Sequence, residues 1–176
     1  MSFVSYNTNK LKEVYYFLVN ANGVASYIIK YCNEKGYMVN NLKLQKLLYY
    51  IALYYFKKTG EMLYLEDIVY WRHGPVVQEV YSNYRYRLDW NISEVSQIIT
   101  YSEPNDDIKE LVRTIVDIYS EYGAWDMVDK IQNELEPVFK EVNSKLIKYT
   151  IDTKHKIVNI SILAKVLDKY PSSIFC

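Results

Sequence analysis

The sequence predicts a mainly α-helical protein that folds as one domain. Apolar residues recur at three- and four-residue spacing over several long segments, which is the period of an amphipathic helix. Only five glycines and four prolines interrupt the 176 residues, and no repeat or low-complexity linker divides them. Half of the residues are hydrophobic and 24% are charged, as in ordinary globular proteins. We therefore expect one compact helical domain over residues 1–176, with a short β element near residues 67–71.

Three helices are expected in the first part of the chain. The first extends from about Asn9 to Asn20, and the second from about Val24 to Lys35, where Gly36 ends it. The third begins after an asparagine cap at Asn40 or Asn41 and continues to about Thr59, before Gly60. Its inward stripe has helical spacing and comprises Leu44, Leu47, Leu48, Ile51 and Tyr55. The opposite face is basic and aromatic but includes Leu53, which predicts a second contact there, either within the molecule or with a partner.

A β-like run and a tight turn follow the third helix. Residues 67–71 contain Ile68, Val69 and Tyr70, which favour a strand. Pro75 suits the first position of a helix with Gly74 as its cap. That helix would turn four apolar residues inward, namely Val76, Val77, Val80 and Tyr81. Residues 84–104 are expected to form a looser connection.

Further helices are expected in the remaining residues. Asn105 to Asp107 cap a helix whose apolar stripe reaches Tyr122 and which ends at Gly123. Another helix covers Ala124 to Leu135, and Pro137 is expected to interrupt it before it resumes over residues 138–149. Residues 161–170 form a last short helix.

Charge and cysteine content argue against several classes of protein. The 21 basic and 21 acidic residues balance, so no overall field attracts nucleic acid or an acidic membrane. The longest apolar run, residues 47–56, is too short to span a bilayer. Cys32 and Cys176 lie far apart and make neither a secreted disulfide framework nor a zinc-ligand set. We therefore expect a cytoplasmic protein without membrane association and without a cofactor.

His73 is the obvious catalytic candidate, because it is one of two histidines and precedes a glycine-proline pair. A general base needs an orienting partner and a nucleophile within reach, and the sequence indicates neither. Cys32 is a candidate nucleophile, but its place on an apolar helix face is typical of a small buried hydrophobe. The sequence therefore favours a binding protein over an enzyme, in which Arg72 and His73 hold the turn or face a partner.

Two segments together resemble the Panacea domain of SocA-like antitoxins and phage-associated GepA-like proteins. The first is residues 42–50, with the sequence LKLQKLLYY, and the second is residues 70–81, with the sequence YWRHGPVVQEVY. The helix beginning at Val24 is similar to the opening segment of that domain, and residues 119–125 are similar to a later one. The resemblance covers about residues 23–140. The family usually continues with Thr-His and Pro-Trp pairs, near which this chain has Ile131-Gln132 and Pro137-Val138.

The resemblance implies an antitoxin of a two-gene toxin–antitoxin module, often carried by phages, that neutralises a cognate toxin protein by direct contact. It also implies an alternative, in which the protein is an adaptor that delivers its toxin to a Clp-type protease. A nucleic-acid-binding regulator is an alternative from a different class. Such a regulator would use residues 84–87, because interleaved aromatic and cationic side chains can stack bases and contact phosphate.

An antitoxin of this kind needs a surface that loses its water on binding and that carries aromatic or arginine anchors. Three parts of the sequence offer such groups: the basic and aromatic face of the third helix, the turn before Gly74, and the segment after the following helix. The predicted partner-binding residues are Lys46, Tyr50, Leu53, Lys57, Trp71, Arg72, His73, Tyr84, Arg85 and Arg87.

Overall fold

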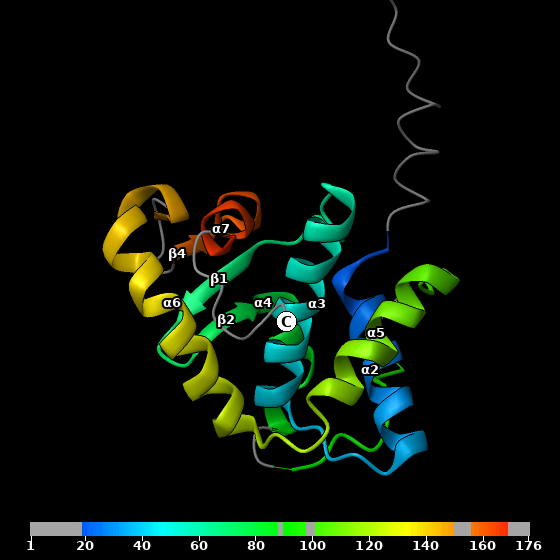
Figure 1. The fold of residues 1–176 in the computed structure, drawn as a ribbon. Coiled ribbons are helices and arrows are strands. Elements are labelled where there is room, and N and C mark those ends of the chain that lie inside the picture. Colours follow the sequence, from blue (N-terminus) through cyan, green and yellow to red (C-terminus); the bar gives the residue numbers. More distant parts are fainter. Residues whose placement is uncertain (1–18, 88–89, 98–100, 150–155, 169–176) are drawn as a thin grey trace, which may run out of the picture.

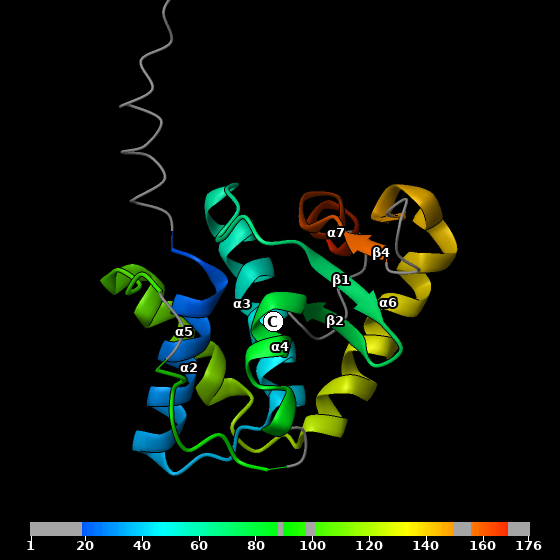
Figure 2. The same ribbon diagram turned by 180° about the vertical axis from the view of Figure 1, so that it is seen from behind.

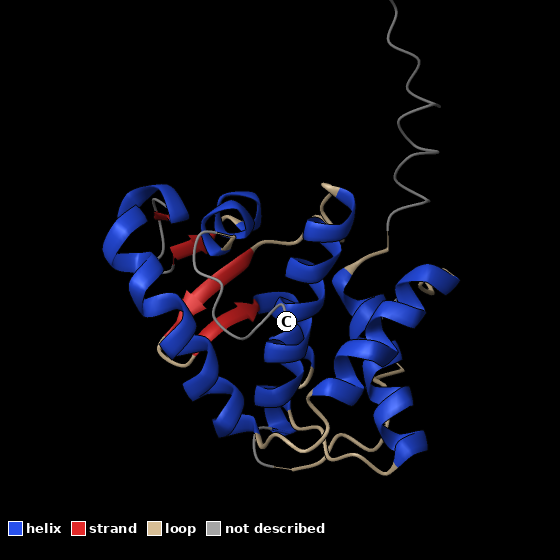
Figure 3. Ribbon diagram, in the orientation of Figure 1, coloured by secondary structure: helices blue, strands red, loops and turns tan. Residues whose placement is uncertain are grey.

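The computed structural model describes residues 19–87, 90–97, 101–149 and 156–168 (Figure 1). Its helices are α2 (Ala21–Lys35), α3 (Asn41–Thr59), α4 (Gln78–Asn83), the 3-10 helix η1 (Arg85–Arg87), α5 (Asp106–Ile118), α6 (Ala124–Leu146) and α7 (Ile160–Leu167). Its strands are β1 (Ile68–Trp71), β2 (Gly74–Val77), β3 (Ile147–Tyr149) and β4 (Lys156–Val158). They form one small sheet in the order β2-β1-β4-β3. The predicted mainly α fold class is confirmed (Figure 3), whereas nearly all of the helix predicted over residues 9–20 lies outside the described residues.

Helix α3 runs through the middle of the molecule. Helices α2 and α5 pack on one side of it, and α6, α7 and the sheet lie on the other (Figures 1 and 2). The predicted inward stripe is confirmed, since Leu44, Leu47, Leu48 and Ile51 are fully buried and Tyr55 is half-buried. Every residue from Lys43 to Leu53 is in fact buried. The helix therefore forms the centre of the core instead of one wall of it.

Asparagine caps begin three of the helices. The sequence predicts the caps of α3 and α5, whereas the cap of α2 at Asn20 was not predicted. The side-chain Oδ1 of Asn20, Asn40 and Asn105 accepts the backbone N–H three residues ahead, at 2.8, 2.9 and 3.0 Å. Each cap satisfies a donor that has no partner within the helix. At the other end, Gly36 (φ +73°) and Gly60 (φ +76°) adopt the left-handed conformation that ends α2 and α3.

The segment Gly74–Val77 is strand β2, so the prediction that Gly74 caps a helix starting at Pro75 is wrong. Strands β1 and β2 form a hairpin in which Trp71 pairs with Gly74, and Arg72 and His73 make its loop. Gly74 has φ +93°, which suits a tight hairpin and disfavours any residue with a side chain. Helix α4 begins only at Gln78. Sheet pairing and burial of Val76 and Val77 outweigh the local helix-start signal, and the predicted β element at residues 67–71 is confirmed.

The C-terminal elements also differ from the prediction. Helix α6 continues past Pro137 to Leu146, and residues 147–149 form β3 instead of more helix. A proline within a helix removes one backbone hydrogen bond, and α6 continues despite that loss while it packs against α3 and α7. Strand β4 has no counterpart in the prediction, because three residues show no periodicity. Helix α5 ends at Ile118, short of Tyr122, and α7 confirms the last helix over residues 160–167.

Three polar side chains of α3 hold the hairpin and α4 in place, and we call them the α3 polar row (Asn41, Gln45 and Lys46). Gln45 accepts the Val77 N–H through Oε1 (2.9 Å) and donates from Nε2 to Asn41 Oδ1 (3.0 Å). Asn41 Nδ2 donates to the Tyr81 carbonyl (3.0 Å), and Lys46 Nζ donates to the Pro75 carbonyl (3.0 Å). Buried backbone groups need such partners. The row therefore determines where residues 75–81 lie.

Replacing Gln45 tests this arrangement. Gln45→Ala leaves the Val77 N–H and Asn41 Oδ1 without these hydrogen-bond partners and opens a small void, so we expect a loss of about 2–4 kcal/mol in the free energy of unfolding. Urea unfolding measures it. The same substitution at the exposed Gln97 serves as the control and should change stability by less than about 0.5 kcal/mol. Equal stability of the two variants would contradict the role of the polar row.

Candidate partner-binding site

A hollow of about 310 Å³ lies where the β1–β2 loop meets α3, α4 and α6. It is lined by Leu42, Gln45 and Lys46 of α3, by Trp71, Arg72, His73 and Val76 of the hairpin, by Tyr81 of α4 and by Trp125 of α6. We call it the turn pocket. The two sequence segments that resemble one family, residues 42–50 and 70–81, therefore meet at one place, and Lys46, Trp71, Arg72 and His73 of the predicted partner-binding residues line it together.

Aromatic rings fix the shape of the turn pocket. The Trp71 ring meets Tyr81 edge-on, with centroids 4.8 Å apart and planes at 77°. The His73 ring meets Trp125 in the same way, at 4.9 Å and 83°. Edge-to-face contacts are a preferred geometry for such rings. Gln132 Nε2 also donates to the Arg72 carbonyl (3.2 Å), so the loop is attached to α6 while the Arg72 side chain is exposed.

Lys46 is a buried cation without a counter-ion among the described residues. Its side chain has no exposed surface, and its Nζ donates to the Pro75 carbonyl. Burial lowers the pKa of Lys46 to about 7, because an ammonium loses its hydration there. A Cβ at Gly74 would lie 3.3 Å from Lys46 Nζ, so glycine leaves the space that the ammonium occupies.

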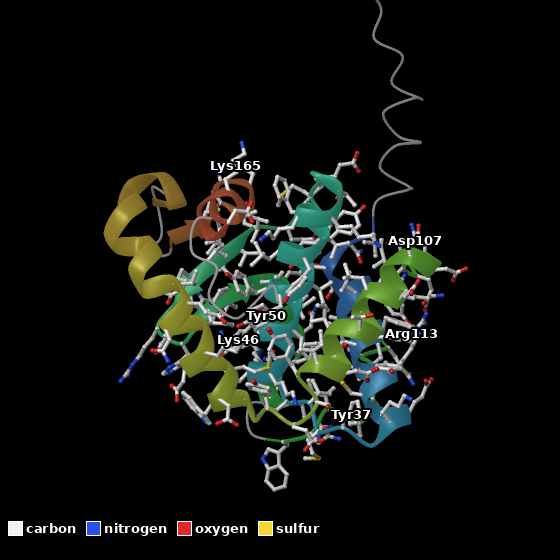
Figure 4. The ribbon with its side chains drawn as sticks, viewed as in Figure 1. Tyr37, Lys46, Tyr50, Asp107, Arg113 and Lys165 are labelled. Carbon is white, nitrogen blue, oxygen red and sulfur yellow. The ribbon has the colours of Figure 1, made fainter. Side chains whose placement is uncertain are left out.

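The structure corrects the expectation that the face of α3 with Tyr50 and Leu53 is open to a partner, since both residues are fully buried. Tyr50 lies between α3 and α6 (Figure 4), where its hydroxyl donates to Glu134 Oε2 at 2.8 Å. Its ring stacks on Tyr119 with centroids 4.6 Å apart. Glu134 also pairs with Lys130 at 2.8 Å, and burial raises the pKa of the Glu134 carboxyl. The second contact predicted for this face is therefore intramolecular.

The remaining predicted residues lie away from the turn pocket. Lys57 pairs with Asp168 at the far end of α3, with 2.5 Å between Nζ and Oδ1. Tyr84 is buried, whereas Arg85 and Arg87 are exposed on η1. Arg85 donates to the Tyr86 hydroxyl (2.6 Å). Tyr84 and Arg87 line a separate hollow, so residues 84–87 form a different surface from the turn pocket.

Sequence reasoning did not place Gln45, Tyr81 and Trp125 in this site. Gln45 was one polar residue among many on a helix, and its two hydrogen bonds depend on segments distant in the sequence. Trp125 is the second residue of α6 and is 57% exposed. A tryptophan in the first turn of a predicted helix, two residues after Gly123, is the sequence signal that could have indicated it.

The surroundings of Cys32 disfavour it as a nucleophile. Cys32 is buried on α2, and burial raises the pKa of its thiol to about 11, so the thiolate that a nucleophile requires is disfavoured. His73 contacts the Trp125 ring. In the part of the chain that the structure describes, no three histidine, cysteine or acidic side chains gather where a metal ion could bind. Within the same residues, none of the helices combines the length and apolar character that crossing a bilayer requires.

One family model matches the chain. It is described as an antitoxin SocA-like, Panacea domain, and it covers residues 44–136, just over half of the sequence. The matched range extends from α3 through the hairpin to α6 and includes most of the turn pocket. The comparisons with curated proteins and with solved structures give no match.

The buried Lys46 predicts how stability depends on pH. Lysine titrates at 10.5 when solvated and near 7 in this fold, so the unfolded chain binds more protons between these values and the free energy of unfolding rises with pH. Lys46→Met should reduce that rise by up to about 1.4 kcal/mol per pH unit. Urea unfolding at pH 7, 8 and 9 measures the difference.

Lys43 is a second buried lysine, and its contribution has to be separated from that of Lys46 in this measurement. Lys43 is also buried on the same helix, its Nζ donates to the Ser120 carbonyl (3.0 Å), and burial lowers its pKa. Lys43 therefore contributes in the same direction, and only the difference between wild type and each variant isolates one lysine. A Lys46→Met curve parallel to the wild-type curve would contradict the buried, easily deprotonated state of Lys46.

Proposed function

This chain belongs to the SocA-like Panacea antitoxin family, and we propose that it neutralises a cognate toxin protein by binding it directly. The match to the family model over residues 44–136 is the observation that carries the proposal. In this role the protein acts in the cytoplasm, catalyses no reaction and needs no cofactor.

The rim of the turn pocket is the surface that best suits a toxin. It combines exposed Arg72 and Trp125 with the partly exposed rings of Trp71 and His73. Tryptophan, tyrosine and arginine are the residues that most often dominate binding energy at interfaces. The edge-to-face contacts and the hydrogen bond to the Arg72 carbonyl hold these groups before binding, which lowers the entropy cost of association.

Co-expression with the adjacent open reading frame tests the function. If that neighbour encodes the toxin, its expression alone arrests growth, and this chain restores growth and co-purifies with it. Restored growth accompanied by loss of the toxin only when a Clp-type protease is present would identify the adaptor alternative instead. If expression of the neighbour alone does not arrest growth, the neighbour is not the toxin. If it arrests growth and this chain does not restore it, neutralisation is contradicted.

Two exposed side chains of the rim provide a test of the surface. Arg72→Ala and Trp125→Ala should each weaken toxin binding by about tenfold or more, because each removes an anchor. Neither should change the urea midpoint by much, since both side chains are exposed. Calorimetry or surface plasmon resonance with purified toxin measures the affinity.

Arg85→Ala is the matched control, since Arg85 is an exposed arginine on a different surface. Loss of affinity in Arg85→Ala with full affinity in Arg72→Ala would move the interface to residues 84–87. Tyr50→Ala is unsuitable for this purpose, because truncating the buried Tyr50 ring costs roughly 3–5 kcal/mol of stability whatever the toxin contacts.

A further inference from the structure

We propose that the turn pocket is a receptor for a carboxylate presented by an apolar or aromatic segment of the partner protein, with Lys46 as the counter-ion. The identity of the partner rests on the proposed function. The chemistry of the pocket does not, because it follows from the residues that line it.

Charge complementarity is the first argument. The lining contains the cationic side chains Lys46 and Arg72 and no acidic residue. Lys46 donates one N–H to the Pro75 carbonyl, and an ammonium carries three donors. A buried cation without a counter-ion is costly, whereas a carboxylate that accepts its remaining N–H groups offsets that cost. Charge-assisted hydrogen bonds of this kind are among the strongest in proteins.

The shape and polarity of the walls are the second argument. Leu42 and Val76 are aliphatic, and the rings of Trp71, Tyr81 and Trp125 supply most of the rest. A volume of about 310 Å³ is at the lower end of the range for ligand pockets, so it admits one or two side chains and excludes a whole helix. A ligand that carries a carboxylate next to an apolar or aromatic group would therefore match a pocket that has a lysine and aromatic walls.

Local geometry keeps the Lys46 ammonium at this place. The Pro75 carbonyl anchors it at 3.0 Å, and the absence of a side chain at Gly74 leaves the space that the ammonium fills. Lys46 has no exposed surface in the free protein, so a carboxylate reaches its ammonium only by entering the pocket and parting the side chains that line it. Gln45 uses its Oε1 on Val77 and its Nε2 on Asn41, so it positions the pocket wall and is not required to bind the ligand. Lys46 is therefore the side chain that recognises the carboxylate.

Proton uptake accompanies this recognition. Above pH 7 the buried lysine loses its proton, and a bound carboxylate restores the ammonium form, so affinity falls by up to about tenfold per pH unit above that value. Arg72, His73 and Tyr81 are the other titratable side chains that line the pocket. His73→Gln therefore accompanies the pH series, and the slope above pH 7 should persist in it and disappear in Lys46→Met.

Small aromatic probes test the pocket without the toxin. The probes are 4-phenylbutyrate and its uncharged amide, and the indole N–H signals of Trp71 and Trp125 in NMR spectra report binding. We expect wild type to bind the carboxylate about tenfold more tightly than the amide. Lys46→Met should lose that preference, while Lys43→Met should keep it, because Lys43 lines a different hollow. Equal binding of the two probes, no binding of either, or a preference that survives in Lys46→Met would overturn the proposal.

Purified toxin tests whether the partner uses the pocket. Lys46→Met should weaken the complex by about tenfold or more and Lys43→Met should not. Unfolding curves for both variants exclude loss of the fold as the cause. Equal toxin affinity of wild type and Lys46→Met would overturn the assignment of the carboxylate to the partner. If wild type neutralised no toxin, the proposed function would fail while the carboxylate preference of the pocket remained measurable.

Discussion

The hydrogen bonds of the α3 polar row are the constraint on which the rest of the site depends. Asn41, Gln45 and Lys46 lie on the central helix and bind backbone groups of Tyr81, Val77 and Pro75. These bonds replace water for backbone groups that the fold buries. They also set the position of the hairpin loop, because Arg72 and His73 immediately precede β2 in the chain and β2 is held on α3. Residues 42–50 and 70–81, which carry the family resemblance, are therefore joined by these hydrogen bonds.

The centre of the molecule contains more polar chemistry than its apolar composition suggests. Lys46 has no exposed surface, and the Tyr50 hydroxyl binds the largely buried carboxylate of Glu134. The two sites differ in how charge is compensated. Glu134 has Lys130 as a counter-ion, whereas Lys46 donates to a backbone carbonyl and pairs with no acidic side chain among the described residues. The first arrangement is complete within the fold, and the second is adjacent to an open pocket, where a partner can complete it.

Different side chains hold the fold and form the proposed binding surface. The side chains that hold the fold, such as Gln45 and Tyr50, are buried, and those of the rim, such as Arg72 and Trp125, are exposed. The rim residues belong to a hairpin loop and to the start of a helix, so rigid elements hold them. Binding groups on rigid elements lose little entropy when a partner docks.

Local patterns in the sequence predict the helical class, the asparagine caps of α3 and α5, the glycines that end α2 and α3, and the inward stripe of α3, because these depend on residues within a turn or two of each other. The sequence also indicates the family, and four of the predicted partner-binding residues, Lys46, Trp71, Arg72 and His73, line one pocket in the fold. Local patterns do not predict that Gly74–Val77 is a strand, that α6 continues through Pro137, or that Tyr50 and Leu53 face the core. These outcomes depend on sheet pairing and helix packing between segments far apart in the chain, which no local pattern records. The membership of Tyr81 and Trp125 in the site has the same origin, since α4 and α6 reach the hairpin loop only after the core has formed around α3.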